Sequence, residues 1–359
     1  MKVSFSRARM RSLGVLAPAA ALAGALLPAS AHAAAQYNLT LTNSGLAAEF
    51  FGIGSTGDVI GDGIEPGAAT SQGFVLTPGS TRVAFLGSPG DPNNTHSFSS
   101  PEGVNSGGDV VGTSTDFNTG IQSAIEWDAN GTPTNLGNLP TIANNYANPD
   151  LTAINDNGVI VGFGRSLHGD TGFEISGTQV TQLPVLPAGG VDAEPLAINN
   201  NGVSVGWADN SQKTVAVQWK NNAIKQLGGL PGSFDSQAFA VNNKGQAVGG
   251  SLDATDFDVH AVLFSGGKVT DLDVPGTGVG DAQANAINDN GVIVGEGGNG
   301  DAFIYQNGQA TDLNQLLPPG SAVTLIDATG INNSGDIVGT AVSNDGSGQT
   351  YGFELTPVS

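Results

Sequence analysis

From residue 36 onward, short apolar stretches alternate with turns rich in Asn, Asp and Gly. One ten-residue phrase carries this alternation, in which apolar residues lead into a polar turn and leave it again. The phrase occurs seven times, as GIGSTGDVIG from Gly52, GVNSGGDVVG from Gly103, AINDNGVIVG from Ala153, AINNNGVSVG from Ala197, AVNNKGQAVG from Ala240, AINDNGVIVG from Ala286 and GINNSGDIVG from Gly330. The start-to-start spacings of 51, 50, 44, 43, 46 and 44 residues indicate a tandem repeat.

Each phrase predicts a β-hairpin. In the third copy, Ile154 leads into a turn of Asn, Asp, Asn and Gly, and Val159 leaves it. Asn and Asp favour turns because their side chains bond nearby backbone, and Gly supplies the positive φ that the turn requires. The sixth phrase position is Gly in every copy: Gly57, Gly108, Gly158, Gly202, Gly245, Gly291 and Gly335.

A second hairpin follows each phrase, so each unit supplies four short strands. Its leading strand reads GFVL, AIEW, GFEI, AVQW, AVLF, AFIY and GFEL in the seven units. Four strands at this period are typical of propeller blades, so we predict an all-β, seven-bladed β-propeller. The last unit lacks its fourth strand, which the N-terminal segment 36–42 can supply by closing the last blade. An open β-solenoid is the alternative architecture.

The first residues predict a targeting segment. A basic start is followed by an apolar run over Leu13 to Leu27 and by an A-x-A pattern ending at Ala33. This layout is typical of a secretory signal peptide over residues 1–33, cleaved after Ala33 or Ala35. The remainder, 36–359, is predicted to be a single seven-repeat domain, exported to the periplasm or the medium. No later stretch is long and apolar enough to cross a membrane.

Charge and cysteine content narrow the function. The leader holds 4 of the 11 Lys and Arg residues and none of the 32 Asp and Glu residues, so 7 cations against 32 acids give the mature chain a net charge of −25. Such a surface repels phosphate backbones, which argues against a nucleic-acid partner. The lack of cysteine excludes thiol chemistry and Cys-based metal sites.

The repeats resemble the HAF-repeat family of bacterial proteins described as extracellular. That family is named for His-Ala-Phe at the head of the third strand. Here His260-Ala261 keeps the first two residues, Ala302-Phe303 keeps the last two, and the family's LGxLPG tail is visible as LGGLPG from Leu227. The resemblance covers nearly all of the mature chain. It implies an exported repeat protein and carries over no catalytic residue.

Several strings that look like sites fit the repeat better. Ser204 in a G-x-S-x-G string and the G-x-G-x-x-G string from Gly52 both fall in hairpins, whereas the enzymes that use these motifs place them where a helix begins. The Asn-rich turns lack the spaced carboxylates of calcium loops. His96, His168 and His260 fall in different blades at different positions, so a metal triad is not expected.

The connections of a propeller divide between two faces. The turns between strands 1 and 2 and between strands 3 and 4 share one face, the turn face. The loops between strands 2 and 3 and the crossings to the next blade share the other, the loop face. Loop-face segments are longer, varied and rich in Asp, and such loops are where function usually sits. The candidate binding residues are Asp150, Asp192, Asp235, Asp281 and Asp327 in crossings and Asp170, Asp256 and Asp258 in 2–3 loops.

Three functions remain open at this stage. The first is a non-enzymatic binding or surface-interaction scaffold that holds a glycan, a cation or a basic protein on its acidic loop face. The second is a secreted carbohydrate-active hydrolase or lyase on the same face, with Trp127, Trp207, Trp219 and Tyr146 available for sugar stacking. The third is a structural envelope or matrix protein. No catalytic residue is predicted, and Ca²⁺ is the only cofactor that the acidic loops suggest.

Overall fold

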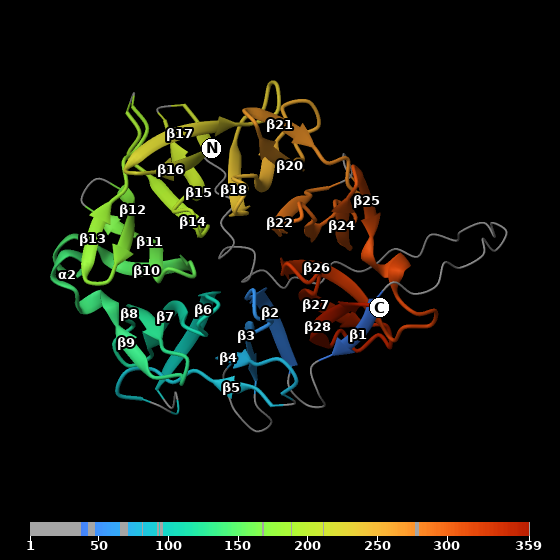
Figure 1. The fold of residues 1–359 in the computed structure, drawn as a ribbon, viewed down its shortest axis with the longest axis horizontal. Helices are drawn as coiled ribbons and strands as arrows, with labels where there is room; N and C mark the ends of the chain where they lie inside the picture. Colours follow the sequence, from blue (N-terminus) through green and yellow to red (C-terminus); the bar gives the residue numbers. More distant parts are fainter. Residues whose placement is uncertain are drawn as a thin grey trace.

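Seven four-stranded antiparallel sheets stand around a central opening (Figure 1). The structure is a computed structural model, and it describes residues 37–41, 47–64, 71–80, 82–91, 93, 96–166, 169–187, 189–210, 212–276 and 280–358. The predicted signal peptide and its cleavage site lie outside the described residues. The sheets are the blades of a seven-bladed β-propeller, as the repeat predicts.

The blades follow the repeats in order. Blade 1 consists of β2 (Ala47–Ile53), β3 (Val59–Ile64), β4 (Gln72–Leu76) and β5 (Ala84–Phe85), and blade 2 of β6 (Ser97–Val104), β7 (Val110–Asp116), β8 (Gln122–Trp127) and β9 (Pro133–Asn135). Blade 3 consists of β10 (Ala147–Ile154), β11 (Val159–Ser166), β12 (Gly169–Ser176) and β13 (Gln179–Gln182). Blade 4 consists of β14 (Ala193–Ile198), β15 (Ser204–Asp209), β16 (Thr214–Lys220) and β17 (Ala223–Gly228).

Blade 5 consists of β18 (Ser236–Val241), β19 (Ala247–Leu252), β20 (Val259–Ser265) and β21 (Lys268–Asp271), and blade 6 of β22 (Gln283–Ile287), β23 (Ile293–Glu296), β24 (Ala302–Gln306) and β25 (Gln309–Asp312). Blade 7 consists of β26 (Val323–Ile331), β27 (Ile337–Ser343), β28 (Thr350–Pro357) and β1 (Tyr37–Leu41). The described helices are short: α2 (Pro140–Asn145) and the 3₁₀ turns η1 (Leu136–Asn138) and η2 (Leu313–Leu316). None of the described helices has the length and hydropathy of a membrane span.

The N-terminal strand closes the ring. β1 pairs antiparallel with β28 as the outermost strand of blade 7, with Tyr37 opposite Pro357 and Leu41 opposite Phe353. Figure 1 shows the blue N-terminal strand beside the red C-terminal blade. The predicted closure is therefore confirmed, and the β-solenoid alternative is wrong, because an open stack would leave this edge of β28 unpaired.

The phrase forms the hairpin between the first two strands of each blade. In blade 3, the Asn155 N–H donates to the carbonyl of Val159 and the Gly158 N–H to that of Asn155, both at 3.0 Å. The sixth-position glycines all have positive φ, between +67° and +94°. Ser204 lies in β15 and is buried, as the hairpin interpretation predicts.

The tenth phrase position is also Gly in every copy, for a different reason. A Cβ added to Gly206 would lie 2.0 Å from the carbonyl oxygen of Glu194 in the neighbouring strand. The six equivalent glycines would place a Cβ 1.9–2.2 Å from the same carbonyl position of their own blades. In blade 4 this approach lies beside a register shift between Pro195 and Ala197. The first two strands therefore approach too closely for any side chain there.

The hydrophobic core lies between the blades. The second residue of the third-strand motifs (GFVL, AIEW, GFEI, AVQW, AVLF, AFIY and GFEL) is completely buried in every blade: Phe74, Ile125, Phe173, Val217, Val262, Phe303 and Phe353. The residue before it is Gly or Ala because the next blade is close; a Cβ on Gly352 would lie 2.6 Å from the ring of Phe50 in blade 1. Trp127 and Trp219 are also buried, and Trp207 is 6% exposed. The expectation that these tryptophans stack on a sugar is therefore wrong.

Candidate binding face

A ladder of asparagines joins neighbouring blades on the turn face. The Nδ2 group of Asn199 donates to the carbonyl of Asn242 in the next blade at 2.8 Å, while its Oδ1 accepts from the backbone N–H groups of Asn201 and Val203. The same inter-blade bond runs from Asn155 to Asn199, from Asn242 to Asn288 and from Asn288 to Asn332. The Asn side chain therefore forms its own turn and holds the next blade.

A second set of bonds runs beside the first, through the residue after each Asn. The Oδ1 of Asp156 accepts from the Ser106 N–H, and the Asp156 N–H donates to Asn200 Oδ1. The pattern continues through Asn200, Asn243 and Asp289 to Asn333. Burial alone would raise the pKa of Asp289, but hydrogen bonds from Asn243 and Asn333 lower it, so this carboxylate stays charged.

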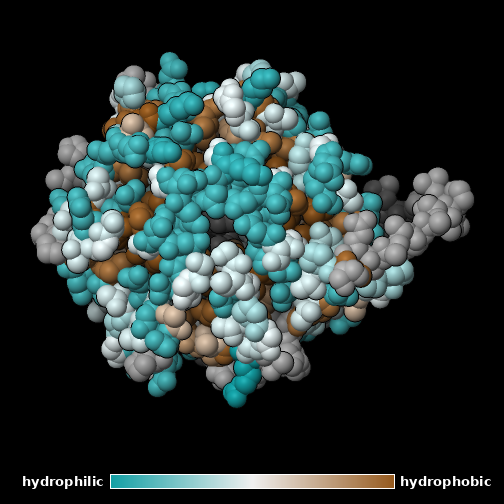
Figure 2. Space-filling view, viewed as in Figure 1, coloured by the Kyte–Doolittle hydropathy of each residue, from teal (hydrophilic) through white to brown (hydrophobic). Residues whose placement is uncertain are grey.

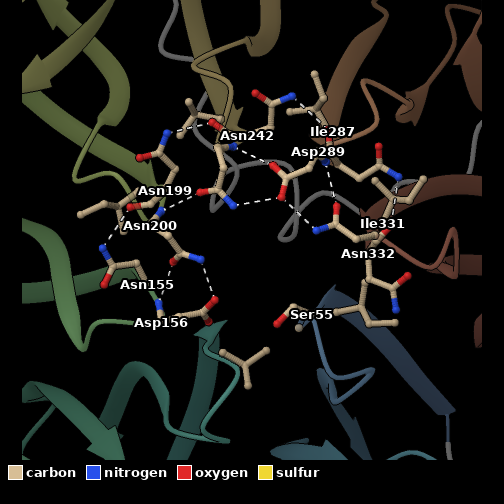
Figure 3. Close-up of a pocket in the computed structure, with 18 of the residues that line it drawn as sticks. Ser55, Asn155, Asp156, Asn199, Asn200, Asn242, Ile287, Asp289, Ile331 and Asn332 are labelled. Atoms are coloured by element: carbon tan, nitrogen blue, oxygen red, sulfur yellow. Dashed lines mark hydrogen bonds between the residues drawn. The ribbon is translucent and has the colours of Figure 1, made fainter.

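These turns surround a cavity of about 220 Å³ at the mouth of the central opening. Figure 3 shows the side chains pointing toward one another around it, and the hydrophilic arc around the opening in Figure 2 lies over the same blades. The ladder runs from blade 3 to blade 7: Gly54 stands in place of Asn in blade 1, and the Asn105 and Asn332 amides bond to an Asp of their own turns. Because the polar groups that line this cavity hydrogen-bond to one another, we interpret the cavity as part of the contact between neighbouring blades.

Three of the predicted loop-face aspartates have a structural role. Asp192, Asp235 and Asp281 precede the first strands of blades 4, 5 and 6. Each Oδ1 accepts a hydrogen bond from a backbone N–H at the start of the third strand of the preceding blade, at 2.8–2.9 Å; the donors are Asp170, Thr214 and Val259. Because the bond recurs in three consecutive blades, these carboxylates fix the crossings, and sequence reasoning missed that role.

Asp150, Asp170 and Asp192 come together around a residue that the sequence analysis did not select, Glu194 of β14. Burial, followed by the charges of these three aspartates, raises the pKa of Glu194 to about 8. Asp150 itself lies within β10, not in a crossing, because that strand starts at Ala147. The group is a proton-binding cluster between blades 3 and 4, with a carboxyl of the strength a general acid needs.

Asp281 and Asp327 approach another glutamate, the half-buried Glu296 at the end of β23. Burial, and then the charges of Asp327 and Asp281, raise the pKa of Glu296 to about 7. Asp327 lies inside β26 and accepts a hydrogen bond from Asn285 Nδ2 at 2.7 Å, so its expected place in a crossing is also wrong. The sequence pattern of apolar and polar residues gave no signal for either glutamate.

Asp256 takes part in a bonded triad on the loop face of blade 5. His260 Nδ1 lies 2.6 Å from Asp271 Oδ2, and His260 Nε2 lies 3.1 Å from Asp256 Oδ2. Burial alone would lower the pKa of His260, but the two carboxylates raise it above its ordinary value. Asp258 follows on the same loop, and its carboxylate accepts no hydrogen bond from the described residues. Among those residues, no group of three or more His, Asp or Glu is arranged to hold a metal ion.

Large apolar side chains are exposed on the loop face among these acids. Six of the seven such side chains in the described chain lie there: Ile64 (42%), Phe117 (53%), Ile121 (59%), Val191 (43%), Phe234 (46%) and Phe257 (67%). The described cations of this face are Arg165, which lies 3.6 Å from Asp170, and Lys213. The loop face is therefore both strongly negative and apolar, a combination that marks binding surfaces.

Comparison with known proteins supports the fold alone. No family model and no curated protein matches the chain, so the resemblance to the HAF-repeat family has no support from them. Among similar solved structures, U3-55K has a TM-score of 0.53 at 10% identity, covering 89% of this chain and 98% of that chain. YCF48 bound to D1 peptide has a TM-score of 0.51 at 10% identity, covering 92% of this chain and 100% of that chain.

TolB from Acinetobacter baumannii has 14% identity and a TM-score of 0.42. The match covers 80% of this chain, and the chain spans 59% of the length of TolB. Together with the sheet topology, the two matches above 0.5 identify the class of the protein: it is a seven-bladed β-propeller.

Proposed function

We propose that this protein is a non-enzymatic binding scaffold that holds a cationic, partly apolar polypeptide against its loop face. One observation carries the proposal: six exposed apolar side chains lie on the face where the carboxylates gather. Apolar anchors supply affinity at an interface, and complementary charge speeds encounter and selects the partner. That a similar propeller, YCF48, is described with a bound peptide supports the choice of a polypeptide.

A titration with a defined probe tests the proposal. The probe is a labelled dodecapeptide with one Arg and three Lys spaced by Leu, and the control peptide carries Glu at the four basic positions. Fluorescence anisotropy should show binding of the basic peptide only, weakening as salt rises. The triple variant Phe117→Ser, Ile121→Ser, Phe257→Ser should bind at least about tenfold more weakly.

The matched control for this variant is Val358→Ser, because Val358 is also exposed but follows β28 at the turn-face end of the strand. Equal binding of the basic and acidic peptides, or equal affinity of the triple variant and the wild type, would overturn the proposal.

Export is part of the proposal: the leader over 1–33 predicts a secreted or periplasmic protein. Sequencing the N-terminus of the mature protein decides this: a start at Ala34 or Gln36 shows cleavage, and a start at Met1 or Lys2 shows none.

A carbohydrate-active hydrolase or lyase is a second candidate, favoured by Glu194. A carboxyl with a pKa of about 8 beside three aspartates is the arrangement of a general acid and its partners. This function predicts turnover of at least one polysaccharide in a broad panel, abolished by Glu194→Gln. Failure of the whole panel at pH 5 to 8 would leave the binding scaffold as the function.

A further inference from the structure

Two exposed aromatic side chains of the loop face form a stacked pair. Phe234, in the crossing from β17 to β18, and Phe257, in the loop from β19 to β20, have ring centroids 5.7 Å apart and planes inclined by 21°. They are nonetheless 46% and 67% exposed. Stacking aligns two large apolar surfaces, and here it leaves much of both rings open to solvent.

Phe257 is held in an unfavourable backbone conformation. Its φ is +65°, in the left-handed region that bulky residues avoid. Such conformations persist only where surrounding contacts hold the backbone in place, and they are frequent at binding sites. Here the loop is closed by the Asp253 N–H donating to the Asp258 carbonyl, and by the Asp258 N–H donating to Asp256 Oδ1.

The His260 triad fixes this loop to the blade. Because Asp256 Oδ2 bonds to His260, and His260 bonds to Asp271 at the end of β21, the residue before Phe257 is tied to the outer strand. His260 is 9% exposed, so little solvent competes for these bonds. An aromatic ring presented on an ordered loop binds without a large ordering cost.

Most of the charged side chains next to the pair are negative. Asp256 and Asp258 flank Phe257 in the chain, and Asp235 follows Phe234. One cation is near, since Lys213 Nζ donates to the carbonyl of Ser233. Three carboxylates against one ammonium place the aromatic surface in a negative field, which favours a cationic group over an anionic one.

We propose that the Phe234–Phe257 pair is the subsite for an arginine side chain of the partner polypeptide. A guanidinium is planar, weakly hydrated and able to stack on an aromatic face while donating to carboxylates, so it matches the ring of Phe257 and the free carboxylate of Asp258. This inference rests on the proposed function and adds which residue of the partner is recognised and where.

A double-mutant cycle tests it with the basic dodecapeptide, whose single Arg is replaced by citrulline in a second probe. Citrulline keeps the shape of Arg and removes its charge. Phe257→Leu keeps an apolar side chain and removes the aromatic face. We expect Phe257→Leu to weaken binding of the Arg peptide about two- to fivefold and to leave the citrulline peptide within error of wild type. Asp258→Asn should weaken the Arg peptide in the same selective way.

The outcomes separate the two proposals. Val358→Leu serves as the matched control and should change neither peptide. If Phe257→Leu weakens the Arg and citrulline peptides equally, the subsite is merely apolar and the arginine assignment is overturned, while the binding scaffold stands. If wild type binds neither peptide, the proposed function itself fails. The exposed position of Phe257 means that these variants should fold, which an unchanged melting temperature would verify.

Discussion

At the scale of single residues, the glycines of the phrase obey two different constraints. Gly202 and its equivalents turn the chain at positive φ, whereas Gly206 and its equivalents let two strands approach. The first constraint concerns backbone rotation and the second concerns contact between strands. Substitution by Ala therefore has distinct costs at the two positions, and the contact constraint should be the more severe.

We predict that Gly206→Ala lowers the free energy of unfolding by more than about 2 kcal/mol, because the new Cβ would overlap the Glu194 carbonyl and force the strands apart. Gly52→Ala is the control: the nearest atoms to a Cβ there lie 3.8 Å away, and four other phrases already have Ala at that position. Urea denaturation measures both. Equal stability of the two variants would contradict the contact explanation.

Sequence alone could predict one of these constraints. The Gly57 series ends a polar turn, which contains Asn in six of the seven copies, and local turn chemistry requires positive φ there. The Gly206 series is required by the close approach of a carbonyl in the preceding strand. That approach lies next to a register shift, which no local sequence pattern predicts. Phe234 and Phe257 escaped prediction for the same reason, since their stacking joins a crossing to a loop of another hairpin.

At the scale of elements, the turns connect blades as well as strands. Turn chemistry predicted the Oδ1 bonds of Asn199 to its own backbone, and these are confirmed. It did not predict the Nδ2 bond to Asn242, because that acceptor belongs to a blade 43 residues away in the chain. The repeat period fixes which turns are neighbours only once the ring geometry is known.

The pair Asn199→Ala and Asn105→Ala compares the inter-blade bond with a bond inside a single turn. Both side chains are 5% exposed and accept the same two local N–H bonds, but Asn105 Nδ2 pairs with Asp109 of its own turn. We expect Asn199→Ala to cost about 1 kcal/mol more than Asn105→Ala, because it leaves the buried Asn242 carbonyl without a partner, whereas water can solvate the partly exposed Asp109 carboxylate. Thermal and chemical unfolding of both variants gives the difference, and a value of zero would show that the ladder adds no stability.

At the scale of the whole molecule, buried acids make stability depend on pH. Glu194 and Glu296 have ordinary pKa values of 4.5 that burial raises to about 8 and about 7, and the pKa of His260 is also raised. Between pH 4.5 and 8 the folded chain therefore binds more protons than the unfolded chain. The free energy of unfolding should fall as the pH rises through this window.

Urea denaturation at pH 5, 6, 7 and 8 tests this prediction, with the double variant Glu194→Gln, Glu296→Gln as the comparison. The variant cannot ionise at either position, so its stability should fall less steeply and should exceed that of wild type at pH 8. The His260 contribution remains in both proteins, complete below pH 6.5 and lost as the pH rises through its folded pKa. A wild-type profile that rises over the window would contradict the prediction.

Closure by β1 is the second property of the whole ring. A chain starting at residue 43 lacks this strand and exposes the backbone edge of β28. Compared with a chain starting at residue 36, we expect a melting temperature lower by at least about 5 °C and concentration-dependent association through the unpaired edge. Light scattering and a thermal melt measure both effects. A monomer of unchanged stability would mean that β1 contributes nothing to closure.

The overall architecture was the part most accessible to sequence. Seven phrases, four strands per unit and a missing last strand determine the blade count and the closure without any tertiary information. The binding face was accessible only in part. Asp256 and Asp258 remain in the proposed surface, whereas Asp192, Asp235 and Asp281 hold crossings in place, because a carboxylate in a loop looks the same in sequence whether it faces solvent or a backbone N–H.

The asparagine ladder has a direction, since each of blades 3 to 6 donates a side-chain amide and the next blade receives it on a main-chain carbonyl. A receiving turn needs no particular side chain, because every residue has a carbonyl. Blade 1, with Gly54, has lost its own donor without altering any donor in blades 3 to 6. A copied repeat would thus arrive with its own connector and fit any neighbour, so such rings can gain and diversify units one at a time.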